Sequence, residues 1–225
     1  MDNRTHYFLL LADIKGSSAL PASKSGAVME QLLPQLDRQN QRLAADIIYP
    51  LEVNYGDEFA GLFSSPRALY QIVSDLRDAL RGIADFRFVT AYGRIGYAGG
   101  SIREMGGPVF ETASRSLNKL KKTKQFSDWQ ISDSATNLAL TAMTNAAADL
   151  IDDMTPYQHI VYMFQKAGLK GTAIAEKLSK DPRSISNAKK AGHTGTAIQI
   201  EQAMAAMLSK LHNEAEHASQ GENES

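Results

Sequence analysis

The stretch NYGDEFAGLF, from Asn54 to Phe63, decides the fold, because it places two adjacent carboxylates behind a glycine and between apolar runs. LEVN at 51–54 and EFAGLFSS at 58–65 have the composition of short strands. A tight link containing Gly56 and Asp57 between two such strands predicts a β-hairpin. A hairpin is an antiparallel pair, so a domain that joins its other strands by helices is expected to have a mixed sheet.

Strands and helices alternate on either side of this hairpin. Residues 7–14, YFLLLADI, predict a buried strand that ends near Asp13. Residues 20–26 have the composition of a turn-rich link, and Pro34 is expected to kink or delay the helix that follows. Further patterns predict helices over 27–47, 68–83 and 109–124, a strand over 86–102, and a last strand from Trp129 with Ser132 or Asp133 capping a helix. The sequence therefore predicts one α/β domain up to about residue 148.

Composition excludes several classes of protein. The 225 residues carry a formal net charge of −1, so the whole chain is not a polyanion binder. The absence of cysteine excludes disulfides and thiolate metal sites. The apolar run near the N-terminus is too short to span a bilayer and lacks the pattern of a signal peptide. We expect a soluble cytoplasmic protein without a membrane partner, most simply a bacterial one.

The C-terminal third has a different character. AAADLIDDMTP, residues 146–156, marks a boundary between residues 1–148 and an all-helical segment over 154–212. From Thr155 to His212 there are eight Lys and Arg against three Asp and Glu, histidines not counted. Residues 213–225 contain four Glu and no Lys or Arg, so this tail is expected to be disordered.

Asp13 and Asp57 form the first group of candidate site residues. If their strands are neighbours, both carboxylates project from one edge of the sheet and suit a hard cation, Mg²⁺ or Mn²⁺, bound together with the phosphates of a nucleotide. Backbone N–H groups of Ile14, Lys15, Gly16, Ser17 and Ser18 are expected to face those phosphates. Glu58 ranks second, since its side chain is expected on the opposite face from Asp57. The alternative is that each Asp only bonds its own backbone in a turn.

Four segments together resemble the class III nucleotide cyclases. ADIKGSS at 12–18 resembles their first metal-binding strand, and NYGDEFAGLF resembles their Gly-Asp hairpin and the tip of the GGDEF diguanylate cyclases. GRIGYAGG at 93–100 resembles a later strand and turn, and residues 106–121 resemble the helix that supplies a transition-state Arg. Their order and spacing agree over roughly residues 5–145.

The resemblance implies a fold, a cofactor and roles for particular residues. It implies a ferredoxin-like, cyclase-type palm domain of mixed α/β sheet that binds a nucleoside triphosphate with Mg²⁺ or Mn²⁺. It also implies a homodimer, because these cyclases build the site from two subunits. The implied residues are Asp13, Ile14 and Asp57 for metal, Arg115 and Glu111 for catalysis, and Lys15, Gly16, Ser17, Ser18 and Lys122 for the nucleotide.

Three positions depart from the family pattern. The Lys that reads the base is here Val53, its Asp partner is Pro108, and an Asn one turn before the Arg is Glu111. Metal and triphosphate binding are therefore implied, while purine recognition of the usual kind is not. With its short hairpin and trailing helical module, the pattern resembles the SatD family.

Residues 157–192 form the second group. Apolar positions at Ile160, Phe164, Ile174, Leu178 and Ile185 fit three short helices, with Thr172 expected to cap the second and Pro182 to open the third. This resembles bacterial helix-turn-helix domains and implies DNA binding. The third helix is expected to expose Arg183, Ser184, Ser186, Asn187, Lys189 and Lys190. The alternative is a small bundle that packs on the first domain or mediates dimerisation.

Three functions are compatible with these patterns. The favoured one is a DNA-binding regulator of SatD type whose cyclase-like domain binds metal and nucleotide. The second is an active metal-dependent nucleotide cyclase or nucleotidyltransferase. The third, a non-catalytic dimerisation scaffold, gives no reason for Asp13, Asp57 and Arg115 to occur together.

Overall fold

The computed structural model describes residues 6–17, 22–54 and 56–221, which belong to two compact units. The first unit comprises Met1–Thr141 and Met207–Ser225, and the second comprises Ala142–Ala206. The division falls inside a helix, earlier than the boundary at 148–154 that the sequence suggests.

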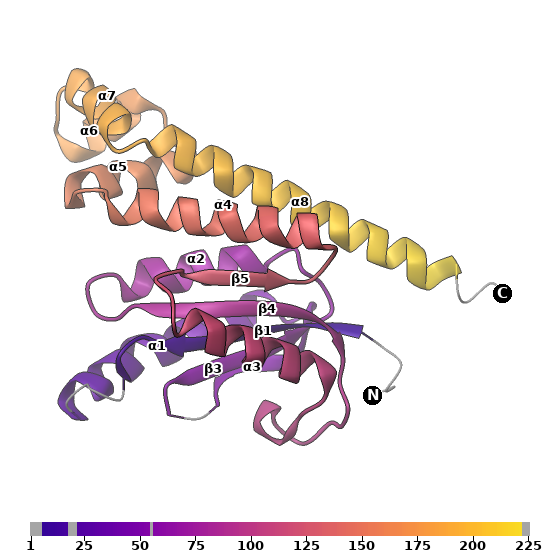
Figure 1. Ribbon diagram of the computed structural model, residues 1–225. Helices are drawn as coiled ribbons and strands as arrows, with labels where there is room; N and C mark the ends of the chain where they lie inside the picture. Colours follow the sequence, from indigo (N-terminus) through magenta and orange to yellow (C-terminus); the bar gives the residue numbers. More distant parts are fainter. Residues whose placement is uncertain (1–5, 18–21, 55, 222–225) are drawn as a thin grey trace. The chain divides into compact units, whose positions relative to one another are not determined.

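The first unit has the predicted alternation of strands and helices (Figure 1). A short 3₁₀ helix, η2 (Ile102–Glu104), lies between the fourth strand and the third helix. The elements are β1 (His6–Ile14), α1 (Ala22–Arg42), β2 (Ile47–Val53), β3 (Glu58–Phe63), α2 (Leu69–Leu80), β4 (Phe86–Arg94), α3 (Pro108–Leu120), β5 (Ser127–Gln130) and the first part of α4 (Ser134–Asp152).

The strands form one mixed sheet in the order β2-β3-β1-β4-β5. Neighbours are antiparallel except β4 and β5, which are parallel. The predicted hairpin is present: the N–H of Asn54 donates to the carbonyl of Glu58 at 2.7 Å, and Gly56 adopts φ 61°, a left-handed conformation that glycine enters without strain. With α1 and α2, the first four strands make the ferredoxin-like arrangement.

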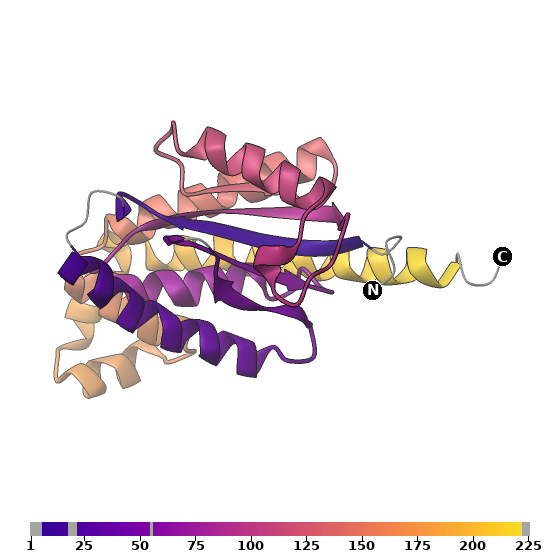
Figure 2. The ribbon, with the colours of Figure 1, turned by 90° about the horizontal axis from the view of Figure 1, so that it is seen from below.

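Alternate residues of β1 enter two different cores. Tyr7, Leu9 and Leu11 pack with the apolar face of α3, whose buried members include Val109, Ala113, Leu117 and Leu120. The intervening residues of β1 therefore face the opposite side of the sheet, where α1 lies (Figure 2). Each fully buried aliphatic side chain contributes about 1.5–3 kcal/mol to such cores. The same parity separates Asp13, on the α3 side, from Ile14, on the α1 side.

The first helix differs from its prediction at both ends. It begins at Ala22, so residues 22–26 are helical rather than a link, and it ends at Arg42, which leaves Ile47 for β2. Pro34 lies inside the helix on its exposed side. A proline there removes one backbone hydrogen bond. Val28, Leu32 and Leu36 are buried on both sides of it, so one continuous apolar face holds the helix together.

The second unit contains three short helices, α5 (Pro156–Lys166), α6 (Gly171–Leu178) and α7 (Pro182–Ala191), between the end of α4 and the start of α8 (Thr194–Gly221). Val161, Ile174, Ala175, Ile185 and Ala188 form their core. Ile160, predicted for that core, is 44% exposed, because the inward face of α5 is one residue further along.

The caps of these helices also correct the sequence reading. Thr172 does not cap α6, which begins at Gly171 after Lys170 and has no side-chain cap. Thr155 and Gln158 form a capping box at α5, and the side chain of Asp181 accepts from the N–H of Arg183 at α7. Pro182 opens α7 as predicted.

The last helix extends through Gly221, into residues 213–225 that the charge pattern predicts to be disordered. Residues 213–220 contain no Pro or Gly, and adding residues to an existing helix avoids the cost of nucleation. Among the residues that the structure describes, no helix is both long and apolar enough to cross a membrane.

Candidate functional site

Three charged side chains lie in a row across the middle strands at one end of the sheet. Asp13 at the end of β1 is directly opposite Glu58 in β3 on one side and Arg87 in β4 on the other. Directly opposite residues on neighbouring strands project to the same face. All three are therefore on the side that α3 covers.

Lys121, the residue that follows α3, completes this row. Its Nζ lies 2.9 Å from Oδ1 of Asp13 and 3.2 Å from Oε1 of Glu58. On the other side of Asp13, Nε of Arg87 lies 3.4 Å from Oδ2, and the guanidinium also donates to the carbonyl of Leu120 at 3.4 Å. The Asp13 side chain is only 6% exposed. Two carboxylates are thus matched by two cations, which offsets the cost of removing them from water.

The environment of Lys121 favours its charged form. Partial burial acts to lower its pKa, but hydrogen bonds and charges from Asp13 and Glu58 outweigh that effect and raise the pKa above its usual value. At neutral pH, two carboxylates therefore hold one ammonium ion between them.

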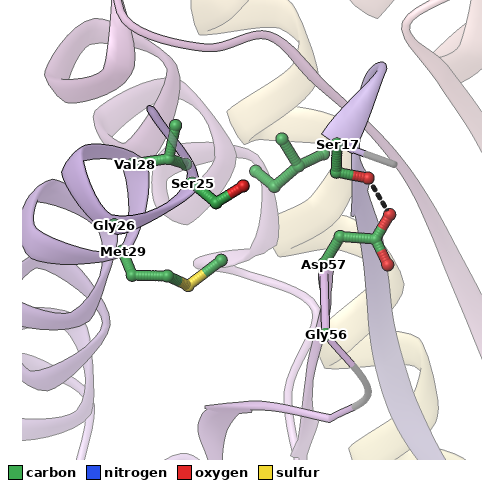
Figure 3. Close-up of a pocket in the computed structure, with 8 residues that line it drawn as sticks. Ser17, Ser25, Gly26, Val28, Met29, Gly56 and Asp57 are labelled. Atoms are coloured by element: carbon green, nitrogen blue, oxygen red, sulfur yellow. Dashed lines mark hydrogen bonds between the residues drawn. The ribbon is translucent and has the colours of Figure 1, made fainter. Parts of the chain in front are cut away.

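Asp57 belongs to the opposite side of the same edge. Its backbone carbonyl accepts from the N–H of Ile14 at 3.0 Å, and its carboxylate accepts a hydrogen bond from the hydroxyl of Ser17. Figure 3 shows these two side chains pointing toward each other in the lining of a pocket of about 450 Å³. The pocket is lined by Ile14, Ser17, Ser25, Gly26, Val28, Met29, Gly56 and Asp57.

The two predicted metal ligands therefore reach one edge of the sheet but have different partners. Asp13 shares a cation with Glu58, which the sequence reading ranked second, while Asp57 bonds Ser17. Sequence reasoning missed Arg87 and the role of Lys121, because strand register and the end of α3 decide them. The sequence signal for Glu58 is its place as the first residue of the strand after the turn.

The predicted phosphate-binding backbone is partly occupied. The N–H of Ile14 donates to Asp57, and the N–H of Lys15 donates to the carbonyl of Asp85 at 2.8 Å. These two donors are engaged within the sheet edge, which corrects the expectation that they face phosphates. Gly16 and Ser17 follow in the turn, and Ser18 lies outside the described residues.

The residues predicted for catalysis lie on the outer surface of α3. Arg115 and Glu111 are exposed, while Ala113, Ser116 and Leu117 face the sheet. Among the described residues, neither forms a hydrogen bond or ion pair with Asp13 or Asp57. Lys122 is also exposed, and its neighbour Lys121 is the residue that reaches the acidic pair. Within one chain, Arg115 therefore does not reach the carboxylates of Asp13 and Asp57.

The carboxylates at this edge suit one hard cation only if the Lys121 ammonium leaves. Within the described ranges, no group of three His, Cys, Asp or Glu side chains converges. Asp13 and Glu58, however, already converge on a cation, the Lys121 ammonium. Mg²⁺ commonly uses one or two carboxylates together with water and phosphate oxygens. The pair therefore suits such an ion once the ammonium has moved away.

The exposed face of α7 matches its prediction in part. Arg183, Ser186, Asn187 and Lys190 are exposed. Ser184 and Lys189 are half-buried, and the Ser184 hydroxyl lies 3.0 Å from the hydroxyl of Tyr157. Ser184 is therefore engaged within the three-helix core rather than presented to a partner.

Comparison with known proteins identifies neighbours by structure alone. No family model matches the chain, and no curated protein matches it. A guanylyl cyclase domain from Blastocladiella emersonii is 18% identical, with TM-score 0.44, over 57% of this chain and 81% of that one. The guanylate cyclase domain of Catenaria anguillulae in complex with GTP is 17% identical, with TM-score 0.43, over 57% and 79%. A bacterial light-regulated adenylyl cyclase is 12% identical, with TM-score 0.42, over 56% and 42%. These neighbours are nucleotide cyclase domains, and likeness at this level decides neither ligand nor activity.

Proposed function

We propose that this protein binds a nucleoside triphosphate with Mg²⁺ or Mn²⁺ at the sheet edge formed by Asp13 and the hairpin tip, and that it belongs functionally with the nucleotide cyclases. The observation that carries the proposal is one edge of the sheet where Asp13 and Glu58 converge on a cation on the α3 side, while Asp57 lines a pocket with hydroxyl and apolar side chains on the other side. A largely apolar pocket with a few polar groups is typical of a small-molecule site.

Each side of the edge has a part in this proposal. The carboxylates on the α3 side provide oxygen ligands for the cation, which would stabilise negative charge on the phosphates. On the α1 side, Ile14, Val28 and Met29 provide apolar surface, and Ser17 and Asp57 provide hydrogen-bonding groups. Val53 and Pro108 lack the side chains that read purines in the cyclases, so the base is left unassigned.

The catalytic form of this function is cyclisation. The 3′ oxygen of the ribose forms a bond to the α-phosphorus, the bond from that phosphorus to the bridging oxygen breaks, the hydroxyl proton passes to solvent, and pyrophosphate leaves. Arg115 and Glu111 are exposed on α3 and do not reach the edge of their own chain. We infer that they act on the site of a second copy in a homodimer, where the guanidinium would neutralise charge on the transferring group.

A thermal-shift experiment tests the proposal. The purified protein is heated with each of the four ribonucleoside triphosphates, with Mn²⁺ or with a chelator, and each mixture is examined by mass spectrometry for cyclic products. We expect a metal-dependent rise in Tm with at least one nucleotide, and a cyclic product if the dimer is catalytic. Asp57→Asn should reduce the rise, while Asp37→Asn on the exposed side of α1 should not. No rise with any nucleotide would contradict the proposal.

A second candidate function is DNA binding through α7, as part of a nucleotide-sensing regulator. The observation that favours it is the exposure of Arg183, Asn187 and Lys190 on one short helix. Such side chains contact base edges and phosphates in DNA complexes. A metal-dependent shift in Tm without any product would favour this regulator over the enzyme.

A further inference from the structure

We propose that Lys121 is an internal counter-cation, which occupies a divalent-cation site made by Asp13 and Glu58 and must be displaced when the metal binds. This rests on the cation of the proposed function, and it adds Glu58 as a ligand and Lys121 as the residue that sets the metal affinity. The sequence ranks Glu58 second among the candidate ligands and does not predict that Lys121 meets the acids.

The geometry of the acidic pair carries the first step. Asp13 and Glu58 are directly opposite in antiparallel strands, so their side chains project from one face at neighbouring positions. Both carboxylates reach one ammonium nitrogen, at 2.9 and 3.2 Å. The pair is therefore already arranged around a positive charge, and the ammonium stands where a metal ion would meet both oxygens.

The difference between the two cations carries the second step. Arg87 has a side chain that is 13% exposed, and its guanidinium also bonds the carbonyl of Leu120, so it is held in place. Lys121 has a side chain that is 38% exposed and extends from the residue after the last turn of α3. Its flexible stem can turn into solvent without unfolding the helix. Lys121 is thus the cation that is able to leave.

The charge balance carries the third step. With Lys121 in place, two carboxylates face two cations, and a further positive ion gains little. With the ammonium gone, Arg87 neutralises Asp13 only, and the negative charge of Glu58 attracts a divalent ion. Charges a few ångströms apart near a protein surface interact strongly enough to change affinity by about tenfold or more. Removing the charge of Lys121 should therefore strengthen metal binding.

The test measures Mn²⁺ binding to the full chain by calorimetry, with no nucleotide present. Lys121→Met keeps most of the stem and removes the charge. Lys119→Met is the matched control, because Lys119 is exposed near the end of the same helix and has no ion pair among the described residues. We expect Lys121→Met to bind Mn²⁺ about tenfold or more tightly than the wild type and Lys119→Met. Adding Glu58→Gln should abolish that gain.

A second readout comes from stability. In chelator, Lys121→Met should have a lower Tm than Lys119→Met, since it leaves two carboxylates facing one cation. Saturating Mn²⁺ should raise its Tm more than it raises that of the wild type. Where Lys121→Met does not fold, Lys121→Gln, which keeps a hydrogen-bond donor, replaces it in both measurements.

Equal Mn²⁺ affinity in a folded Lys121→Met, the wild type and Lys119→Met would overturn the inference and leave Lys121 as a structural ion pair only. This result is separate from the proposed function, because the experiment contains metal alone. A gain in Mn²⁺ affinity without any nucleotide binding would keep the inference and reject the function. Nucleotide binding with unchanged Mn²⁺ affinity would do the reverse.

Discussion

The carboxylate of Asp13 lies 2.9 Å from the ammonium of Lys121, although the two residues belong to the first strand and to the turn after the third helix. This ion pair connects a residue that the sequence marks as a metal ligand to the lysine next to Lys122, which the resemblance implies for the nucleotide. Because Arg87 balances the other oxygen of Asp13, the row of Asp13, Glu58, Arg87 and Lys121 is neutral without a metal. The folded chain therefore neutralises the Asp13 carboxylate with its own side chains when no metal is bound.

Replacing Asp13 should cost more stability than replacing Asp57. Asp13→Ala removes a nearly buried carboxylate and leaves Arg87 without its charged partner, and losing one member of a buried pair costs about 3 kcal/mol. Asp57→Ala removes one side-chain hydrogen bond in a turn, worth about 1 kcal/mol. Urea unfolding followed by circular dichroism measures both free energies of unfolding.

The comparison has a control in Asp13→Asn, which keeps the shape of the side chain and removes its charge. Its cost should lie near that of Asp13→Ala, because Arg87 and Lys121 lose the same partner charge. Equal small losses of stability for Asp13→Ala and Asp57→Ala would show that the row of charges adds nothing to stability. The result also decides which acid is the safer target in binding experiments.

Acid should weaken the start of α4 through Asp133. Hydrogen bonds from the hydroxyl and the backbone N–H of Thr136 lower the pKa of Asp133, and the N–H of Ala135 adds another. A lowered pKa in the folded state means that the carboxylate contributes stability above its unfolded pKa of about 3.9, which is lost as the pH falls through the folded value. The Tm difference between wild type and Asp133→Asn, measured from pH 7 down to pH 2, should therefore shrink at the acid end. A constant difference over that range would contradict this prediction.

Most of the fold can be predicted from the sequence, because hydrophobic periodicity and turn-forming residues act over short stretches of the chain. The hairpin around Gly56, the buried β1 and the cap at Asp133 each depend on residues close in the chain, and each is confirmed. The predicted start of α1 is wrong, because Ser and Lys in residues 22–26 resemble a link, whereas the buried face from Val28 to Leu36 extends the helix. The prediction for Ile160 is wrong because α5 is rotated by one residue.

The site is harder to predict from the sequence, because its interactions join segments that are far apart in the chain. The sequence predicts Asp13 and Asp57 at one edge, and the hydrogen bond from Ile14 to Asp57 places them there. Which acid meets Asp13 depends on register, and a shift of one residue exchanges Glu58 for Asp57. The choice among several lysines at the end of α3 depends on where the helix ends, which a single sequence gives only to within a few residues.

Replacing both Lys189 and Lys190 with Ala should weaken DNA binding at every sequence, if α7 binds phosphates. Removing one lysine that binds a phosphate should reduce the slope of log K against log salt by about 1. Fluorescence anisotropy with labelled duplexes at several salt concentrations measures both quantities. Lys210→Ala is the control, because Lys210 is exposed on α8 and its removal changes the charge without touching α7. Equal affinity in the double variant and in Lys210→Ala would reject α7 as the DNA-binding helix.

A final prediction concerns the second copy of the chain. If Arg115 acts across a dimer, Arg115→Ala should bind nucleotide and metal as the wild type does, yet form no product. Asp57→Asn should fail at an earlier stage, with weaker binding. A homodimer of either variant lacks the same group at both of its sites, so neither variant alone should form product.

Mixing the two inactive variants makes the test decisive. A chain with Asp57→Asn still carries Arg115, and a chain with Arg115→Ala still carries Asp57, so a mixed dimer contains one complete site. Random exchange of equal amounts should recover roughly a quarter of the wild-type sites. Product formation is followed by mass spectrometry after the two proteins have been incubated together. Since α3 holds Arg115 on its exposed face, away from the carboxylates of its own chain, recovery requires the partner to supply it. Activity in Arg115→Ala alone would remove Arg115 from the reaction, and no recovery from a mixture in which the dimers exchange would contradict a site shared between two chains.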